Sequence, residues 1–194
     1  MIRSFGTDDK PEGKMMKKTW VACAAGLLLV TGAANAISVS GEAGQHYTNL
    51  GVGMSTGSSG LGLTGNWARS DHDGNVGSVG LNFGVPLGPL TATVGAKALY
   101  LSPKDGKSGG AVALGGGLEW EINRYFSLHG EGYFAPDSFT SGVKAYNEAS
   151  GGLRWKFRPL SVDVGYRYMQ MEGKDGRRDN TLADGPYVGV GLSF

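Results

Sequence analysis

Apolar and polar residues alternate along most of the chain after residue 36, and no stretch shows the helical spacing of about 3.6 residues. Clusters of Gly, Pro, Asn and Asp divide this part into segments that we interpret as β-strands. We expect about ten strands, at residues 37–46, 48–56, 60–69, 77–87, 90–101, 111–122, 126–135, 146–157, 160–169 and 185–194. In the first two segments the apolar positions change from odd to even numbers, which predicts a turn or bulge near residues 47–49.

The connections between these segments alternate between short and long. The short ones are TGSSG, VPLGP, INRYF and FRPL, and the long ones are SDHDGNVGS, SPKDGKSGG, APDSFTSGVKAYN and EGKDGRRDNTLADG. Short periplasmic turns and longer extracellular loops are typical of outer-membrane barrels. The pattern therefore predicts an all-β fold, a closed antiparallel transmembrane β-barrel of about ten strands, with eight strands as the alternative.

The aromatic residues decide between a membrane barrel and a soluble one, because alternation alone leaves both open. Trp67, Tyr100 and Tyr166 lie toward the long-loop ends of their segments, and Trp120 and Trp155 lie toward the short-turn ends. Two aromatic belts that flank an aliphatic band are typical of the two membrane interfaces. A soluble core would place its bulky residues in the middle. We therefore expect the apolar face to contact lipid.

The N-terminal part has the pattern of a secretory signal peptide. Lys17 and Lys18 precede an apolar run at residues 20–30, and small residues follow, ending in the A-x-A sequence at residues 34–36. We expect residues 1–36 to comprise an extension and a cleaved signal that starts at about residues 15–16, and residues 37–194 to form the barrel. A longer signal that includes residues 1–14 is the alternative. Cleavage would also remove Cys23, the single cysteine, and exclude a disulfide-stapled scaffold.

The last strand ends on an aromatic residue, whereas chain termini usually fray. Its pattern, Tyr187-x-Gly189-x-x-Leu192-x-Phe194, resembles the C-terminal signal by which the barrel-assembly machinery recognises its clients. Closure of a barrel onto its first strand would also pair this strand on both sides. We therefore expect the secretion and barrel-assembly machineries to be partners.

Several loop and strand motifs resemble the YfaZ family of predicted outer-membrane proteins of Gram-negative bacteria. These motifs are HYTNLGVG, GNWARSD, PLGPLTATVG, LYLSPKDG, GYRY, GKDGRRDN and ADGPYVGV, and the resemblance covers the signal and essentially the whole mature chain. It implies an outer-membrane β-barrel, and it brings no substrate and no catalytic residues. The residues before the two lysines are its one departure.

The polar face carries charges that hairpin register brings together. A turn at residues 158–159 places Arg154 opposite Asp163, and a turn at residues 123–125 places Glu119 opposite His129. The proposed charge network in the lumen consists of Glu119, His129, Glu131, Arg154, Asp163 and Arg167. Ten strands leave a narrow interior. We therefore favour a lumen filled by paired charges, in a structural or surface-loop binding protein, over a small-solute pore.

Other functions have weaker support in the sequence. Ser127, His129 and Glu131 suggest a lipid-modifying enzyme, but residues i and i+2 of one strand project in parallel about 7 Å apart, beyond hydrogen-bond reach. The three histidines have no metal-ligand spacing, and DHDGN lacks most positions of a calcium loop. The near-balanced charge suggests no nucleic acid. We expect no cofactor and no metal, and lipid and lipopolysaccharide as surroundings, with GKDGRRDN either contacting phosphates or simply solvated.

Overall fold

The computed structural model describes residues 36–55 and 60–194. The described residues belong to one compact unit, Ala34–Phe194. The predicted signal peptide, its extension and most of the TGSSG connection lie outside the described residues.

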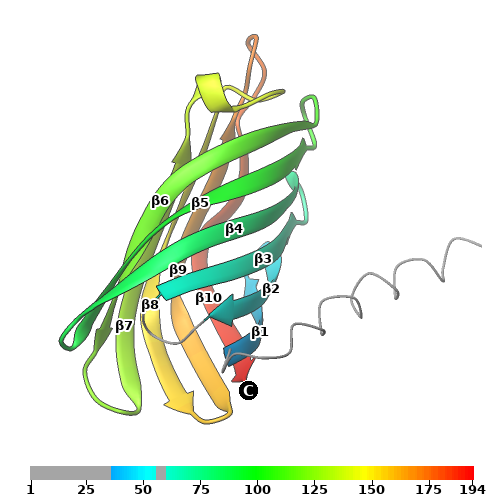
Figure 1. The fold of residues 1–194 in the computed structure, drawn as a ribbon. Coiled ribbons are helices and arrows are strands. Elements are labelled where there is room, and N and C mark those ends of the chain that lie inside the picture. Colours follow the sequence, from blue (N-terminus) through cyan, green and yellow to red (C-terminus); the bar gives the residue numbers. More distant parts are fainter. Residues whose placement is uncertain (1–35, 56–59) are drawn as a thin grey trace, which may run out of the picture. The chain divides into compact units, whose positions relative to one another are not determined.

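The described part of the chain contains ten antiparallel strands, which confirms the predicted fold (Figure 1). They are β1 Ala36–Gly44, β2 Tyr47–Ser55, β3 Gly60–Ser70, β4 Gly74–Leu87, β5 Leu90–Pro103, β6 Gly109–Glu121, β7 Phe126–Ala135, β8 Ala145–Phe157, β9 Leu160–Glu172 and β10 Asn180–Ser193. One short 3-10 helix, η1 Asp137–Phe139, lies between β7 and β8. Within the two described ranges, no helix is long and apolar enough to cross a bilayer.

The sheet closes into a barrel because each strand pairs with its sequence neighbour and β10 pairs with β1. The closing ladder runs from Ser38 opposite Ser193 to Gly44 opposite Tyr187. Backbone hydrogen bonds in both directions between Ile37 and Phe194, 3.2 and 2.9 Å long, extend it. The C-terminal strand is therefore an integral part of the wall, as expected.

The strands are longer and the loops shorter than the sequence suggests. The β3–β4 connection has only residues 71–73, and β5–β6, β7–β8 and β9–β10 are joined by residues 104–108, 136–144 and 173–179. Residues 45–46 join β1 to β2 at the same end, so the predicted turn or bulge is a turn, and it lies just before residues 47–49. We call this end the long-loop end and the opposite one the short-turn end. Polar residues that look like loop, such as Asn75 and Asn180, pair within the ladders instead.

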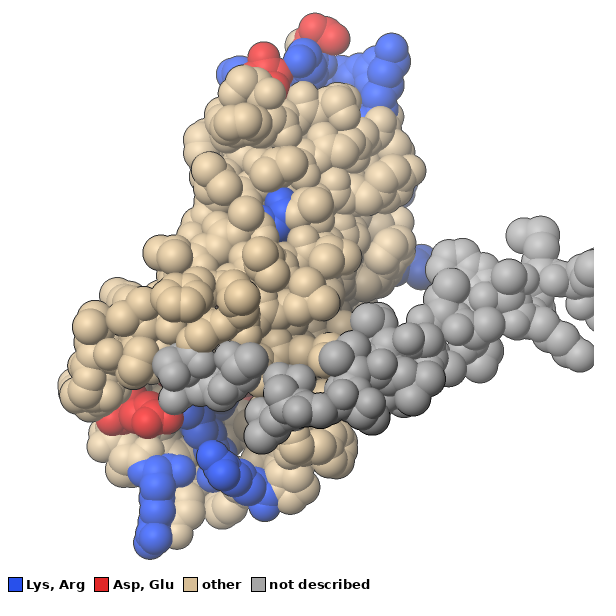
Figure 2. Space-filling model, in the orientation of Figure 1, with Lys and Arg blue, Asp and Glu red and all other residues tan. Residues whose placement is uncertain are grey.

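The outer wall of the barrel is apolar, as the alternation predicts. Leu50, Leu81, Val94, Leu114 and Val188 are each more than half exposed. Figure 2 shows Lys, Arg, Asp and Glu gathered toward the two ends of one face, with a largely uncharged surface between them. An exposed apolar band of this extent is stable in lipid rather than in water.

The interior differs from the expectation of a lumen filled by charge, because its long-loop portion is apolar. Its side chains, which we call the apolar plug, are Val76, Leu99, Leu101, Tyr146, Met169, Met171 and Leu182, all buried. On β5, Leu99 and Leu101 follow Lys97 toward the long-loop end, and on β9 Met169 and Met171 follow Arg167 in the same way. The charged groups therefore lie on the short-turn side of the apolar plug. The sequence did not predict the plug, because most of these residues lie close to or beyond the predicted ends of their strands.

Candidate functional site

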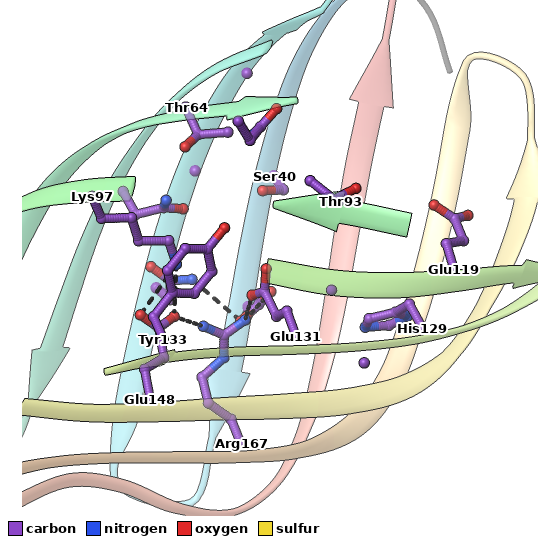
Figure 3. A pocket seen from close by; sticks show the side chains of 18 of the residues that line it. Ser40, Thr64, Thr93, Lys97, Glu119, His129, Glu131, Tyr133, Glu148 and Arg167 are labelled. Atoms are coloured by element: carbon purple, nitrogen blue, oxygen red, sulfur yellow. Dashed lines mark hydrogen bonds and ion pairs between the residues drawn. The ribbon is translucent and has the colours of Figure 1, made fainter. Parts of the chain in front are cut away.

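A cavity of about 340 Å³ lies in the lumen, between the apolar plug and the short-turn end. Figure 3 shows its two unlike sides. Lys97, Glu148 and Arg167 are gathered on one side, and Ser40 and Thr64 lie away from them. The cavity is therefore bounded by a charged wall and by a wall of neutral polar residues.

The charged wall is centred on Glu148, from the long-loop part of β8. Its carboxylate accepts hydrogen bonds from Lys97 Nζ at 3.1 and 3.2 Å and from Arg167 Nη1 at 3.1 Å. Tyr146, a member of the apolar plug, donates its hydroxyl to the same carboxylate at 3.1 Å. The Lys97 ammonium also lies 3.7 Å from the centroid of the Tyr133 ring. Three donor groups thus converge on Glu148, which compensates for the burial of its carboxylate.

Arg167 connects this group to two further carboxylates. Its Nη2 lies 3.1 Å from Glu42 Oε2 and 3.8 Å from Glu131 Oε1. Arg167 stands on β9 and Glu42 on β1, so the contact spans β10. One guanidinium is thus shared by three carboxylates, on β1, β7 and β8. This bidentate and bridging role suits arginine, whose planar fork offers five donors.

A second cluster lies nearer the short-turn end, in the register expected from the sequence. Arg154 faces Asp163 in the β8–β9 ladder and donates from Nε to Asp163 Oδ2 at 2.8 Å. Glu119 faces His129 in the β6–β7 ladder. Glu119 forms its closest ion pair with Lys156, at 2.7 Å, and a longer one with Arg154, at 4.0 Å. The two predicted pairs are thus joined through Arg154.

Tyr187 completes this second cluster. Its hydroxyl donates to Asp163 Oδ1 at 2.8 Å and lies 3.2 Å from His129 Nε2. His129 Nδ1 is 3.7 Å from Asp163 Oδ2, which is beyond hydrogen-bond distance. Ser127 and His129 both face the lumen, but no hydrogen bond joins their side chains.

The six residues proposed for the lumen network all lie in these two clusters: Arg167 and Glu131 in the first, and Arg154, Asp163, Glu119 and His129 in the second. The predicted network did not include Lys97, Glu42 and Glu148, and so it missed that Glu148 is the centre of the first cluster. It also missed Tyr133 and Tyr146 as lumen residues. A tyrosine on the polar face of an alternating strand was the available signal.

The aromatic residues proposed as girdles lie on the outer wall. Trp67, Tyr100, Trp120, Trp155 and Tyr166 are all exposed. Trp155 stacks on Phe126, with ring centroids 5.8 Å apart, near the short-turn end. Tyr166 lies halfway along β9 rather than toward the long-loop end, and it donates a hydrogen bond of 2.6 Å to Asp184.

The proposed C-terminal assembly signal divides between the two faces of β10. Leu192 and Phe194 are exposed on the outer wall, whereas Tyr187 is buried and Gly189 lies beside Glu42 and Asp163. The first half of this motif therefore also shapes the lumen.

Ion pairs hold the loops together at the long-loop end. Arg178 contacts Asp73 at 3.0 Å and Asp105 at 3.3 Å, and so joins three connections. Lys174 donates to Asp137 at 2.6 Å, and this hydrogen bond raises the pKa of Lys174. Among the residues with described positions, no three His, Cys, Asp or Glu side chains are placed to hold a metal ion.

Two solved structures resemble this barrel weakly. The NanC porin has a TM-score of 0.43 and 14% identity, over 83% of this chain and 99% of that one. The outer-membrane channel DcaP of Acinetobacter baumannii has a TM-score of 0.41 and 13% identity, over 81% of this chain and 62% of that one. Resemblances of this degree carry no information on function.

Sequence comparison is far more specific. The family model described as YfaZ precursor matches residues 16–194. The outer membrane protein YfaZ of Escherichia coli (strain K12) is 54% identical over 180 residues, which cover 92% of this chain and all of that protein. Both agree with the resemblance carried by the loop motifs. The chain therefore belongs to the YfaZ family and is an outer-membrane protein.

Proposed function

We propose that this protein is a non-enzymatic outer-membrane barrel whose lumen does not let solutes pass from one end to the other, with the short turns in the periplasm and the loops outside the cell. The observation that carries the proposal is the apolar plug. Leu101, Tyr146 and Met171 are fully buried in the lumen between the charged clusters and the loops. A hydrated ion would have to lose its water to pass through apolar side chains packed in this way, which is costly.

A non-enzymatic role is supported by the arrangement around His129. A serine nucleophile needs a base within hydrogen-bond reach. Instead, His129 contacts the Tyr187 hydroxyl, and Asp163 is occupied by Tyr187 and Arg154. These contacts fit a structural network better than an acyl-transfer or hydrolytic site. A lipid-modifying enzyme is the least favoured function.

The proposed surroundings follow from the outer wall and the loops. The apolar band fits the hydrocarbon core, and the exposed aromatic residues fit the interfaces on its two sides. Basic loop residues, among them Lys107 and Arg177, are available to lipopolysaccharide phosphates. Phe194 and Leu192 are proposed as the outward contacts for the barrel-assembly machinery.

A small-solute pore is the second candidate, and the 340 Å³ polar cavity favours it. Conductance across a planar bilayer separates the two functions. Refolded wild-type protein is expected to show no stable open level. Leu101→Ala combined with Met171→Ala removes the bulk of two plug residues and should produce openings. The matched control combines Leu114→Ala with Val188→Ala, on the outer wall.

Each preparation is first checked for the folded state by its heat-dependent gel mobility, so that an unfolded variant is not scored as closed. Large, stable wild-type conductance would contradict the closed lumen and establish the pore instead. Turnover of a phospholipid or lipid A substrate that is lost in Ser127→Ala would contradict the non-enzymatic role.

A further inference from the structure

The neutral wall of the lumen cavity consists of hydroxyl and amide side chains that the fold itself does not use. They come from β1, β3, β4 and β5 and are Ser38, Ser40, Thr64, Asn66, Asn82 and Thr93. Among the described residues, these six side chains make no hydrogen bond to other protein groups. Each can both donate and accept. A wall of this kind is complementary to a solute with several hydroxyl groups.

The charged wall has more carboxylates than cations. Glu42, Glu131 and Glu148 are paired with only Arg167 and Lys97. Glu148 makes the close contacts with both cations, so the uncompensated charge is shared by Glu42 and Glu131. Glu131 has the weakest pairing, 3.8 Å from Arg167 Nη2, and its side chain is 35% exposed, toward the cavity that it lines. An excess negative charge in a confined space favours the entry of a cation.

Asn49 contributes a further unsatisfied acceptor beside the same carboxylates. Asn49 is buried, with 5% of its surface exposed, and it lines the cavity. Its amide nitrogen donates to Glu42 Oε2 at 3.3 Å, while its carbonyl oxygen Oδ1 has no hydrogen-bond partner. This unused acceptor beside Glu42 adds to the negative potential of the charged wall.

We propose that this cavity binds a small polyhydroxylated organic cation, with its ammonium group against the cavity-facing side of the Glu131 carboxylate and its hydroxyl groups against the Ser, Thr and Asn wall. The volume of about 340 Å³ is sufficient for a solute the size of a monosaccharide. The solute enters from the short-turn end, and this one aspect rests on the proposed closure by the apolar plug.

Glucosamine and glucose form a matched pair of probes, because they differ by an ammonium group in place of a hydroxyl. Binding to the refolded, detergent-solubilised protein is measured by calorimetry and by the midpoint of thermal unfolding, with sodium chloride added to the glucose samples to equalise ionic strength. We expect one glucosamine per barrel, a raised unfolding midpoint, and at least tenfold weaker binding of glucose.

Glu131→Gln keeps the size of the side chain and removes the excess charge, so it should fold at least as well as the wild type and lose at least tenfold in glucosamine affinity. Asn49→Leu tests the carbonyl acceptor without changing the charge, and it should also weaken binding. Asp137→Asn, in the β7–β8 loop at the opposite end, removes the same charge and should leave the affinity unchanged.

Equal binding of glucose and glucosamine, absence of binding, an effect reproduced by sodium chloride alone, or indifference to Glu131→Gln would each overturn the proposal. The closed lumen is tested separately. A barrel that conducts and is blocked by glucosamine would contradict the closed lumen and support the binding site. A barrel that neither conducts nor binds glucosamine would support the closed lumen and contradict the binding site.

Discussion

The hydroxyl of Tyr187 donates a 2.8 Å hydrogen bond to Asp163 on the neighbouring strand, inside the lumen. Asp163 accepts a second bond of the same length from Arg154. Tyr187 is also the first residue of the proposed C-terminal assembly signal, whose last residue, Phe194, is exposed on the outer wall. Tyr187 therefore contacts groups inside the lumen, whereas Phe194 faces outward, and mutations at the two positions should have different effects.

Removal of Phe194 should lower the amount of assembled barrel in the outer membrane, because it deletes an outward aromatic contact and the backbone pairing with Ile37. Tyr187→Phe should assemble in normal amounts and lose about 1.5–3 kcal/mol of unfolding free energy, the usual contribution of a hydrogen bond to a charged group. Heat-modifiable protein in membrane fractions measures the first effect, and urea unfolding measures the second. Normal levels of folded protein without Phe194 would contradict the assembly role.

Arg167→Met should be the most destabilising of the lumen charge substitutions. It leaves Glu42, Glu131 and Glu148 without the guanidinium that they share, and an uncompensated buried charge costs about 3–5 kcal/mol. Arg154→Met is the matched comparison. The side chain of Arg154 is 35% exposed, against 7% for Arg167, and Asp163 keeps its hydrogen bond from Tyr187, so the loss should be smaller. Equal urea midpoints for the two variants would show that water reaches the Arg167 cluster as readily as it reaches the second cluster.

Gly165→Ala should destabilise the barrel and disturb Tyr187. A methyl group at Gly165 would collide with the backbone of Gly151 and approach the Tyr187 hydroxyl at 2.9 Å. The control is Gly185→Ala on β10, where an added methyl group meets nothing within 4 Å. Urea unfolding should show a clear loss for the first variant and almost none for the second. A loss in both would point to backbone effects of glycine instead of the close approach.

Arg178→Ala should loosen the loops with little effect on global stability. Its ion pairs with Asp73 and Asp105 are exposed, and such pairs contribute about 0–1 kcal/mol each. Faster proteolysis within residues 173–179 is the expected result. Arg177→Ala is the neighbouring control, because its side chain has no ion pair in the described part of the chain. The difference between the variants should shrink in high salt.

Mature protein should begin at Ile37 and fractionate with the outer membrane, because the A-x-A sequence ends at Ala36. N-terminal sequencing of the protein purified from membranes provides the measurement. A mature chain that retained residues 1–36 would contradict the proposed cleavage site.

Strand order and local register could be predicted because they depend on neighbouring segments. Period-two alternation marks the strands, and a two-residue turn at residues 158–159 is sufficient to place Arg154 opposite Asp163. The loops were overestimated for a related reason. Gly and Asn usually indicate turns, yet Gly74 and Asn180 are paired in ladders, because the neighbouring strands extend as far as these residues.

The centre of the candidate site could not be predicted from register. Arg167 reaches Glu42 across 125 residues of sequence and over an intervening strand, which depends on closure of the barrel and on its curvature. The apolar plug was missed for a similar reason. Leu101 and Met171 look like further alternating residues at the ends of strands, and only the convergence of several strands shows that they fill the same space.

The apolar plug consists of side chains carried by hydrogen-bonded strands, and this limits how the lumen could ever open. A loop folded into a barrel can swing out on a hinge, but Leu101 and Met171 leave the interior only if β5 or β9 leaves the wall. Each of these strands is paired on both sides along most of its length. In the proposed closed barrel, a solute that enters the lumen cavity from the short-turn end therefore has no second exit and must leave through the same opening.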